Sequence, residues 1–321
     1  MIYLYKEDVL KCIDFDELMD SIEEAYKIYE SKKFNMTDRI HIDNNDLTAL
    51  YMPCFLENTF GTKIFTVAPN NTKLNKPVID GVMVVNDIET GEIVCIIDGK
   101  ILTALRTGAV GGVGVRHTTS EDITRIGLIG TGAQGFYQIL YACKARDIKD
   151  VYLYNRTKEK ALILKEQLEK NLENINIHIV DSSKELVKKS ELIITATTSN
   201  TPVIDNDKEL LKGKHIVAIG SYKPNMRELP DALFEILDKI TVDTEFGKIE
   251  SGDLSVPIEK NLINDEDIIS MGEFLANENK FEAKGKTTLY KSVGMALFDM
   301  VIASKIYQSA VEKNIGQNIN L

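Results

Sequence analysis

A glycine-rich turn between a short apolar strand and a helix constrains this chain more than any other feature. Gly130, Gly132 and Gly135 form the pattern G-x-G-x-x-G directly after the apolar run 126–129, and the run 136–142 can continue as a helix. A strand that enters a helix through such a turn aims main-chain N–H groups and the positive helix end at a pyrophosphate. A glycine-rich turn alone is weak evidence, but strand, turn and helix occur here in the required order. The sequence therefore predicts a dinucleotide site with contacts from Gly130, Thr131, Gly132, Ala133 and Gln134.

The end of the next strand indicates which dinucleotide binds. The residue facing the adenosine ribose is expected about twenty positions after the last glycine, where strand 151–154 ends in Asn155, Arg156, Thr157 and Lys158. Sites for NAD usually carry an acid there, which accepts a hydrogen bond from the ribose 2′-OH. None of these four residues is acidic, and Arg156 can instead make a bidentate contact with a 2′-phosphate. The alternative is a solvated charged turn. We expect NADPH to be preferred, with NADH possible, and Asn155, Arg156 and Thr157 to contact it.

The middle of the chain, from about residue 123 to 243, alternates short apolar runs with amphipathic stretches. This alternation is typical of a parallel sheet with helices on both faces. Six strands with the glycine loop after the first fit the α/β, doubly wound (Rossmann) fold. We assign a dinucleotide-binding domain to residues 121–289. The six expected strands are 126–129, 151–154, 177–180, 192–196, 215–219 and 240–242.

Residues 1–120 are expected to form a separate α+β domain, completed by residues 290–321. A helix is predicted over 21–33, and the strand-like runs after it are typical of an antiparallel meander. The last two runs flank Asp87–Gly91, which has the composition of a hairpin turn. The four runs are 47–56, 62–68, 78–86 and 93–97.

Two helices are expected at the ends of the dinucleotide-binding segment. Thr103 is a plausible N-cap for the first helix. This helix contains four glycines (108, 111, 112 and 114), which either allow close packing or mean that the helix is short. The apolar stretch 290–301 leads into the second, which reaches about residue 311 and is apolar enough to pack back on the first domain. The segment 314–321 is expected to be frayed.

Composition excludes several classes of function. A net charge of -11 with no basic stripe argues against nucleic acid as a partner. The four cysteines are scattered without a C-x-x-C pair, which predicts reduced thiols and neither a disulfide framework nor a zinc site. The N-terminus lacks the pattern of a signal peptide, and no apolar run approaches the roughly 20 residues that span a bilayer. We expect a soluble, cytoplasmic protein that holds no metal.

Two basic residues lie where they can point into a cleft. Lys63 is part of the strand-like run 62–68, which is otherwise rich in β-forming residues, and Arg106 is near the start of the helix after Thr103. A basic residue within an apolar strand must pair, extend its charge to the surface or serve a site. For Lys63, the surface of a strand and a functional group both remain open.

The chain resembles the ornithine cyclodeaminase/μ-crystallin family, in order, from about residue 39 to 307. The most specific element is Leu102-Thr103-Ala104-Leu105-Arg106-Thr107. The other matching elements are Gly61-Thr62-Lys63 with Pro69-Asn70-Asn71, Asp87-Ile88-Glu89-Thr90-Gly91, Asp98-Gly99, the glycine loop 130–135 and Ser292-Val293-Gly294.

The resemblance implies a homodimer, an N-terminal substrate and dimerisation domain, and a nicotinamide-dependent reaction at the α-carbon of an amino acid. Arg106 and Arg39 would bind the substrate carboxylate, for which a guanidinium fork is suited, although Arg39 could instead belong to a solvated loop. Lys63 would lie near the reacting nitrogen or the carboxylate. Further cofactor contacts are expected from Thr197, Ser221 and Val293.

Two departures from the family pattern bear on the reaction. Cyclodeaminases carry an aspartate after the fifth strand, and Tyr222 stands at that position here. Tyrosine, with a pKa near 10, is a poor base at pH 7. An acid that holds the substrate amino group is replaced by Leu50, before Tyr51-Met52-Pro53. Deamination of ornithine is therefore not expected.

The remaining residues suit the reduction of a cyclic ketimine, which needs a hydride donor, a carboxylate clamp and one proton source. The expected substrates are Δ1-pyrroline-2-carboxylate and Δ1-piperideine-2-carboxylate, reduced to proline and pipecolate. Lys63, Tyr222 or a water could donate the proton. The alternatives are an alanine dehydrogenase or opine-type amino-acid dehydrogenase, an ornithine cyclodeaminase, and a non-catalytic protein that binds a small molecule.

Overall fold

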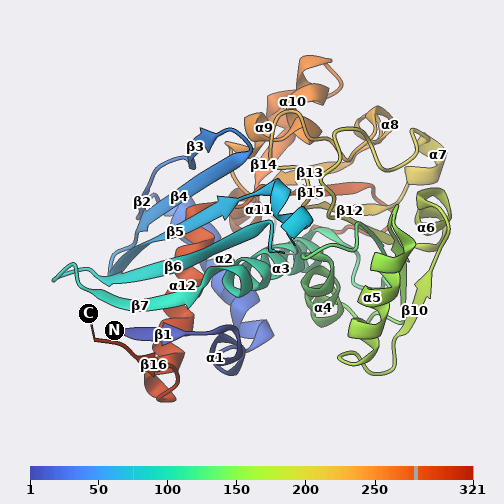
Figure 1. The fold of residues 1–321 in the computed structure, drawn as a ribbon. Helices are drawn as coiled ribbons and strands as arrows, with labels where there is room; N and C mark the ends of the chain where they lie inside the picture. The colour runs from blue at the N-terminus through green and yellow to red at the C-terminus, as the bar shows by residue number, and fades with distance from the viewer. Residues whose placement is uncertain (75, 278–280, 321) are drawn as a thin grey trace. The chain divides into compact units, whose positions relative to one another are not determined.

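The computed structural model describes residues 1–74, 76–277 and 281–320, and the chain forms two compact units (Figure 1). The first unit contains residues 1–106 and 295–321, and the second contains residues 107–294. The first break falls within helix α3 (Gly99–Thr118), whereas the boundary drawn from the sequence at residue 120 falls just after that helix.

The first unit is built on an eight-stranded sheet, in which β4, β5, β6 and β7 follow one another as an antiparallel meander. The strand order is β16-β1-β7-β6-β5-β4-β2, and β3 also pairs with β4. The strands are β1 (Ile2–Leu4), β2 (Asn35–Met36), β3 (Ile40–Asn44), β4 (Leu47–Phe55), β5 (Thr59–Val67), β6 (Ile79–Asp87), β7 (Ile93–Asp98) and β16 (Gln317–Asn318). The helices of this unit are α1 (Lys6–Lys11), α2 (Phe15–Ser31), the 3-10 helix Pro69–Leu74 and α12 (Ala296–Glu312).

One face of this sheet is covered by helices. Helix α12 packs on β4, β5 and β6 and also contacts α2, and in Figure 1 the red α12 runs behind these strands. On β5, Gly61, Lys63 and Phe65 are buried on one face, where Lys63 contacts Asp299 of α12, while the alternate residues are more exposed. This alternation is the period-two pattern of a strand with one covered face.

The ends of helix α2 and of the hairpin β6–β7 have local causes. The side chain of Asp14 accepts hydrogen bonds from the main-chain N–H groups of Asp16 and Glu17, so α2 begins six residues before the predicted Ser21. The helix ends at Ser31, and its C-cap Lys32 has φ of 57°. The predicted hairpin turn at Asp87–Gly91 is confirmed, with φ of 75° at Gly91.

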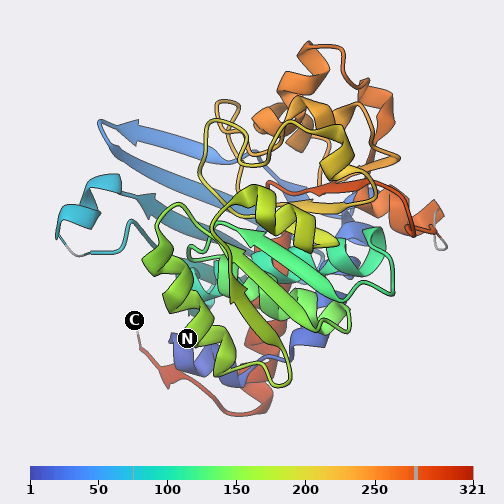
Figure 2. The ribbon, with the colours of Figure 1, turned by 90° about the vertical axis from the view of Figure 1, so that its right-hand side faces the viewer.

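One expectation about the edge of this sheet was wrong. The segment after α12 was predicted to fray, but β16 pairs antiparallel with β1, and the chain ends lie close together in Figures 1 and 2. The predicted antiparallel meander is present, and at its edge β1, which was not predicted, pairs parallel with β7. Strands of two and three residues carry too short a pattern to be seen in the sequence.

Helix α3 begins at Gly99, not at Thr103. Asp98 accepts hydrogen bonds from the N–H groups of Lys100 and Ile101, so Asp98 acts as the cap and Thr103 lies inside the helix. The prediction that the glycines allow close packing is confirmed. A Cβ on Gly108 would lie 2.6 Å from the ring of Tyr141, and one on Gly114 would lie 2.1 Å from the ring of Tyr290.

The second unit is an eight-stranded sheet in which every described strand pair is parallel, in the order β10-β9-β8-β11-β12-β15-β13-β14. The first five strands in this order have the doubly wound arrangement, with the strand order reversing beside β8. Figure 2 views this sheet from another side. The strands are β8 (Arg125–Ile129), β9 (Asp150–Tyr154), β10 (Asn176–Ile179), β11 (Leu192–Thr195), β12 (His215–Ala218), β13 (Lys239–Val242), β14 (Ile268–Ser270) and β15 (Thr288–Lys291).

The helices of the second unit are connected to these strands in sequence. Helix α5 packs on β9 and β10, α6 on β8 and β9, and α11 on β13 and β14. None of the helices in the described ranges combines the length and apolarity needed to cross a bilayer. The helices are α4 (Gly135–Ala145), α5 (Lys158–Glu169), α6 (Ser183–Lys189), α7 (Lys208–Leu211), α8 (Asp231–Phe234), α9 (Gly247–Glu250), α10 (Gly252–Glu259), the 3-10 helix Asp265–Asp267 and α11 (Met271–Asn277).

The six predicted strands of this unit are all present, but the sheet has two more. Strand β15 takes the sixth place, between β12 and β13, and β14 lies at the edge. Residues 290–301 were expected to lead into the following helix, because the charged Lys291 weakens the apolar pattern of β15. That lysine is fully buried in the structure.

Candidate active site and dinucleotide site

The three glycines of the loop after β8 have three different roles. Gly130 has φ of 98°, and a Cβ there would lie 2.6 Å from the carbonyl oxygen of Ala196, so only glycine fits. A Cβ on Gly132 would meet no atom within 4 Å, which leaves the main chain open to a ligand. Gly135 packs closely, since its Cβ would lie 3.1 Å from Leu128 and 3.2 Å from Leu164. These are the roles that a dinucleotide loop assigns to its glycines.

Polar groups at this loop are left for a ligand. The Oγ1 atom of Thr131 and the Oε1 atom of Gln134 are buried, and neither has a hydrogen-bond partner among the described residues. The loop also leads into helix α4, whose first N–H groups point toward it. The residues present therefore fit a bound pyrophosphate.

Asn155 links the glycine loop to the end of β9. Its Oδ1 accepts a hydrogen bond from the N–H of Thr131 at 3.2 Å, and its Nδ2 donates to the carbonyl oxygen of Thr157 at 2.9 Å. Asn155 therefore holds two loops in register at the carboxyl edge of the sheet. A side chain that ties both loops is well placed to orient the ribose between them.

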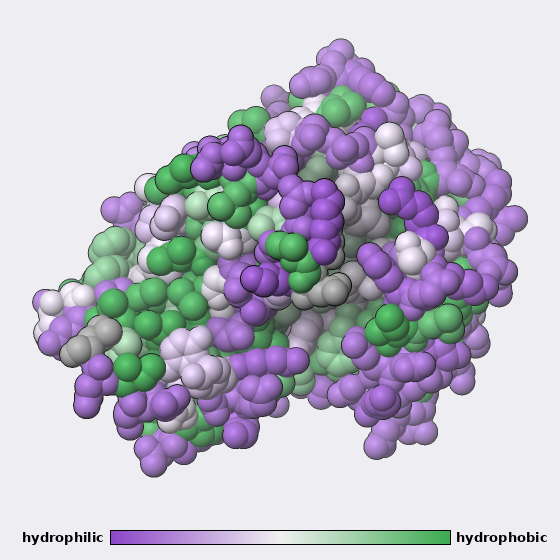
Figure 3. Space-filling view, in the orientation of Figure 1, coloured by the Kyte–Doolittle hydropathy of each residue, from purple (hydrophilic) through white to green (hydrophobic). Residues whose placement is uncertain are grey.

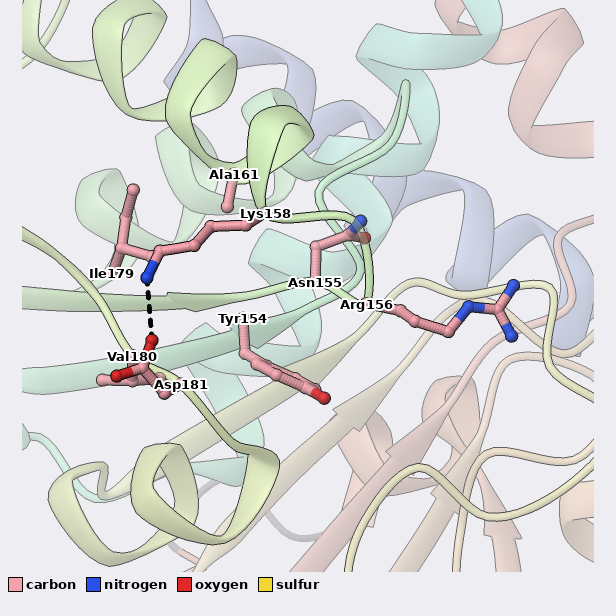
Figure 4. A pocket seen from close by; sticks show the side chains of 8 residues that line it. All are labelled: Tyr154, Asn155, Arg156, Lys158, Ala161, Ile179, Val180 and Asp181. Atoms are coloured by element: carbon pink, nitrogen blue, oxygen red, sulfur yellow. Dashed lines mark hydrogen bonds and ion pairs between the residues drawn. The ribbon is translucent and has the colours of Figure 1, made fainter.

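A pocket of about 140 Å³ lies beside Asn155 and is drawn in Figure 4. Lys158 reaches across it to Asp181, with 2.8 Å between Nζ and Oδ1, while Arg156 extends the opposite way. Arg156 is exposed and has no ion pair within the described ranges. The full lining is Tyr154, Asn155, Arg156, Lys158, Ala161, Ile179, Val180 and Asp181.

The acid in this pocket was not foreseen. Asp181 follows β10, so it comes from the third strand and not from the position after β9 that usually selects NAD. Its ion pair holds Lys158 and raises the pKa of that lysine. A 2′-phosphate would have to compete with Asp181 for Lys158, whereas Arg156 is available without such competition.

The first unit brings together two of the predicted catalytic residues through a third. Lys63 on β5 and Arg106 on α3 both contact Asp299 on α12: Lys63 Nζ lies 2.7 Å from Oδ2, and Arg106 Nε lies 3.0 Å from Oδ1. Lys63 is 3% exposed, Arg106 7% and Asp299 0%. Two buried cations therefore face one carboxylate. The Nε–H group is one of five donors on a guanidinium, so Arg106 has further donors for a second carboxylate.

Burial lowers the pKa of Lys63 to about 7. Asp299 opposes this shift because its negative charge stabilises the ammonium, while Arg106 and Arg39 add to the shift by repulsion. A group with a pKa near 7 can both give up and recover a proton at neutral pH, as general acid catalysis requires. The thiol of Cys54, whose pKa burial raises to about 12, stays protonated nearby.

The face of the sheet around Lys63 is apolar. Lys63 pairs in register with Met52 on β4 and with Met83 on β6, and both methionines are buried. Leu50 pairs with Phe65, two residues along each strand, so it lies on the same face as Lys63. The position where the family places an acid thus presents a hydrocarbon side chain to this face.

The other predicted residues lie as follows. Arg39 is half-buried, just before β3, and is close enough to influence the pKa of Lys63. Tyr222 belongs to the second unit, in the loop after β12, and is half-buried with Lys223 Nζ 5.9 Å from its ring centroid. Thr197, Ser221 and Val293 follow β11, β12 and β15, so they share the carboxyl edge of the parallel sheet with the glycine loop.

Asp299 is the main functional candidate that the sequence analysis missed. It is separated from Lys63 by 236 positions, so no local pattern could connect them. The available signal was an acid inside the apolar stretch 290–301, where a carboxylate needs a buried partner. That stretch was interpreted only as a packing helix.

Comparison with known proteins identifies the family. The model of the "Ornithine cyclodeaminase/mu-crystallin family" matches residues 2–314. A Delta(1)-pyrroline-2-carboxylate reductase of Bacillus cereus is 32% identical over 99% of both chains. An alanine dehydrogenase of Archaeoglobus fulgidus is 29% identical over 98% of this chain and 97% of its own.

A solved structure gives a similar result. The Delta(1)-pyrroline-2-carboxylate reductase of Thermococcus litoralis, determined in complex with NADH and L-proline, superposes with a TM-score of 0.92 at 30% identity. The superposition covers 99% of this chain and 100% of the other. The resemblance to this family stated from the sequence, and the fold class, are confirmed.

Proposed function

We propose that this chain, which belongs to the ornithine cyclodeaminase/mu-crystallin family, is an NAD(P)H-dependent reductase of cyclic ketimine amino acids. The substrates would be Δ1-pyrroline-2-carboxylate and Δ1-piperideine-2-carboxylate, and the products proline and pipecolate. Support comes from the relatives that carry the name Delta(1)-pyrroline-2-carboxylate reductase. The first unit would bind the substrate, and the second would bind the dinucleotide.

The observation that carries this proposal is the buried contact of Lys63 and Arg106 with Asp299. Two cations against one carboxylate leave the cluster one positive charge in excess when Lys63 is protonated. Burial makes such an excess costly unless a further anion joins it. The carboxylate of a ketimine acid supplies that anion, and a bidentate contact with Arg106 would fix its orientation.

Lys63 would supply the proton. In the reduction, a C–H bond forms at the α-carbon and an N–H bond forms at the imine nitrogen, while the C=N π bond is lost. Bound NAD(P)H would provide the hydride. The Nζ–H of Lys63 would donate to the nitrogen, and its lowered pKa favours that transfer at neutral pH. Tyr222 is the other candidate catalytic residue, because its hydroxyl could donate the proton to the imine nitrogen in place of Lys63.

Ornithine is a poor fit to this site. Its charged side chain would need an acid, but Leu50 lies on the face of Lys63 and Tyr222 stands where cyclodeaminases carry an aspartate. Placing an ammonium group against apolar side chains without a partner is strongly unfavourable. We therefore propose that ornithine is not a substrate for deamination.

NAD(P)H use is supported by the glycine loop and by relatives bound to NADH or NAD. We propose a preference for NADPH, with the adenosine ribose near Asn155, Arg156 and Thr157. The ion pair of Lys158 with Asp181 would limit this preference. Gly130, Thr131, Gly132, Ala133 and Gln134 would contact the pyrophosphate, and Thr197, Ser221 and Val293 the nicotinamide side.

We further propose a homodimer that forms through the face of the first sheet that lies away from α12. Apolar side chains on this face are only half-buried in the single chain, and Figure 3 shows green, apolar atoms gathered over this region. An archaeal alanine dehydrogenase that is 27% identical, with a TM-score of 0.90, is a dimer. The residues are Ile64, Val82, Val84 and Ile96.

The dimer is testable by sedimentation. Ile64→Asp would place a charge in the interface and should shift the protein toward monomer, while Lys27→Asp on the exposed side of α2 should not. A monomeric unmodified protein would rule out the dimer.

We also propose a cytoplasmic location, because all four cysteines are free and cytoplasmic proteins usually keep their thiols reduced.

A second candidate is an alanine dehydrogenase or opine-type activity, which the similarity to the Archaeoglobus enzyme favours. Oxidation of NADPH and NADH should be followed with both cyclic ketimine acids, with pyruvate plus ammonia, and with ornithine. The proposal predicts the highest kcat/KM for a cyclic ketimine. Greater turnover with pyruvate and ammonia would favour the dehydrogenase, and cofactor binding without any turnover would favour a binding protein.

A further inference from the structure

The loops after β11 and β12 are held by one buried carboxylate. Glu228 is 0% exposed. Its Oε1 accepts the N–H of Thr197 at 2.7 Å, and its Oε2 accepts the N–H groups of Gly220 at 2.8 Å and Ser221 at 3.1 Å. The hydroxyl of Thr195 donates to the same Oε2 at 3.0 Å. A single side chain therefore fixes the main chain of two neighbouring loops at the carboxyl edge of the sheet.

The loop after β15 is held by a different carboxylate. Asp243, also 0% exposed, follows β13, and its Oδ2 accepts the N–H groups of Val293 at 2.9 Å and Gly294 at 2.6 Å. The hydroxyl of Ser292 donates to this oxygen at 2.7 Å. Ser292, Val293 and Gly294 are thereby held by one acid from the adjacent strand.

A second layer keeps Glu228 in place. Asp253 Oδ1 accepts the N–H groups of Glu228 at 2.7 Å and Leu229 at 2.9 Å. Lys291 Nζ donates to the carbonyl oxygen of Ser221 at 2.7 Å and lies 3.5 Å from Asp253 Oδ2. All of these side chains are fully buried, so the network is part of the interior of the second unit.

Burying these acids is costly, and burial raises the pKa of both Glu228 and Asp243. Apolar residues of similar size would stabilise a purely structural interior at least as well. What the carboxylates provide, and apolar residues cannot, is a fixed direction for each main-chain N–H in the three loops. In a doubly wound fold, these loops face the half of the dinucleotide that lies beyond β8.

We propose that Glu228 and Asp243 are positioning residues for the nicotinamide half of the cofactor, because they orient the three loops that carry Thr197, Ser221 and Val293. This inference rests on the proposed use of a nicotinamide cofactor. The adenosine half has separate anchors, the glycine loop and Asn155, which share no hydrogen bond with Glu228 or Asp243 in the described part of the chain. The two halves of the site are thus predicted to respond independently to substitution.

The test compares the whole cofactor with a fragment that lacks nicotinamide. NADPH and 2′-phospho-ADP-ribose are titrated by calorimetry into the unmodified protein, Glu228→Gln and Asp243→Asn. The amide of Glu228→Gln must turn an NH2 group toward at least one of the donors that the carboxylate accepts, so the loops should shift. We expect fragment affinity to stay within about twofold, and the added affinity of NADPH over the fragment to fall by about tenfold, as one unpaired donor implies.

Controls separate this role from a general loss of structure. Glu209→Gln, on the exposed side of α7, removes a charge and should change neither affinity. Ser292→Ala removes one donor to Asp243, so the added affinity of NADPH over the fragment should fall by less than in Asp243→Asn. This variant replaces Asp243→Asn if that protein fails to fold. An equal loss for fragment and NADPH, or no loss for either, would overturn the proposal.

The binding test needs no imine and is therefore independent of the reaction. Normal cofactor binding without turnover would refute the proposed reductase activity and leave the positioning role standing. Loss of nicotinamide-side affinity in Glu228→Gln would support the positioning role. If the unmodified protein binds neither ligand, both proposals are wrong.

Discussion

The two units both bury charged side chains, but they balance the charge in opposite ways. In the first unit, Lys63 and Arg106 meet a single carboxylate, Asp299. In the second unit, the carboxylates of Glu228, Asp253 and Asp243 share the ammonium group of Lys291 and also accept hydrogen bonds from main-chain N–H groups.

The difference indicates which cluster is open to a ligand. The acids of the second unit each accept hydrogen bonds from main-chain N–H groups of the chain itself, so that cluster can act as a framework. The cations of the first unit face fewer anions than their charge requires, and a buried charge without a full counter-charge favours binding of an anion. A buried charged group is therefore a candidate for substrate binding when the fold leaves its charge unbalanced.

The largest effect is expected for Lys63→Ala. Removing a general acid costs about 10²- to 10⁴-fold in rate, and kcat and kcat/KM should fall together because the ammonium acts on the transition state. Affinity for NADPH, measured by calorimetry, should not change, because Lys63 belongs to the first unit and not to the glycine loop.

The control for this variant is Lys33→Ala, an exposed lysine after α2, which should retain full activity. If Lys63→Ala also retains full kcat on the best imine, Lys63 is a structural residue, and the excess positive charge of the first unit's cluster has no role in catalysis.

Asp299→Asn is predicted to shift the pH dependence. Burial lowers the pKa of Lys63, and the negative charge of Asp299 partly offsets that shift. Without Asp299, the pKa of Lys63 should therefore fall below about 7. Because the donor must be protonated, kcat/KM falls as pH rises through the pKa, and this alkaline limb should move to lower pH in the variant. Removing one partner of a buried pair also costs about 3–5 kcal/mol of stability, which urea unfolding would measure.

Glu312→Gln, at the exposed end of the same helix, is the matched control and should leave the pH profile in place. An unchanged alkaline limb in a folded Asp299→Asn protein would show that Asp299 does not govern the protonation of Lys63.

The parts of the fold and of the site that could be predicted are those whose sequence pattern lies within a few consecutive residues. The glycine loop and the strands β8 to β12 were predictable because each has a continuous signal of a few residues. Lys63 and Arg106 stood out as basic residues in a strand-like run and near the start of a helix, and the family resemblance then implied their roles. Asp299 and Glu228 could not be found in this way, because each gains its meaning from partners that only the folded chain brings close.

The same reasoning explains the errors in the fold. Strand β15 contains Lys291, whose partners Ser221 and Asp253 are far away in sequence, so a buried lysine was not expected there. Thr103 has the composition of a cap, but Asp98, five residues earlier, satisfies the first N–H groups of α3. Local propensity is overridden when a neighbour competes for the same role.

A smaller effect concerns the cofactor. Arg156→Asp should reverse the preference for NADPH, because an acid repels the 2′-phosphate and accepts from the 2′-OH. Asp181→Asn should strengthen the preference, since it releases Lys158 from its ion pair. About tenfold changes in the ratio of kcat/KM for NADPH and NADH are expected, for one charge-assisted contact.

These ratios should be measured at two salt concentrations, because exposed charges are screened. Equal use of both cofactors by the unmodified protein would contradict the role of Arg156. An Asp181→Asn protein with an unchanged ratio would mean that Lys158 does not reach the phosphate.

Binding of a substrate carboxylate by the unbalanced cations of the first unit can be tested by removing that carboxylate from the substrate. Reduction of Δ1-pyrroline-2-carboxylate should be compared with reduction of Δ1-pyrroline, by the unmodified protein and by Arg106→Lys, which keeps the charge but not the fork. We expect the carboxylate to raise kcat/KM by about 10²- to 10³-fold, as two charge-assisted hydrogen bonds would, and Arg106→Lys to lose much of this gain. Equal kcat/KM for the two imines in the unmodified protein would show that the cations do not bind the carboxylate.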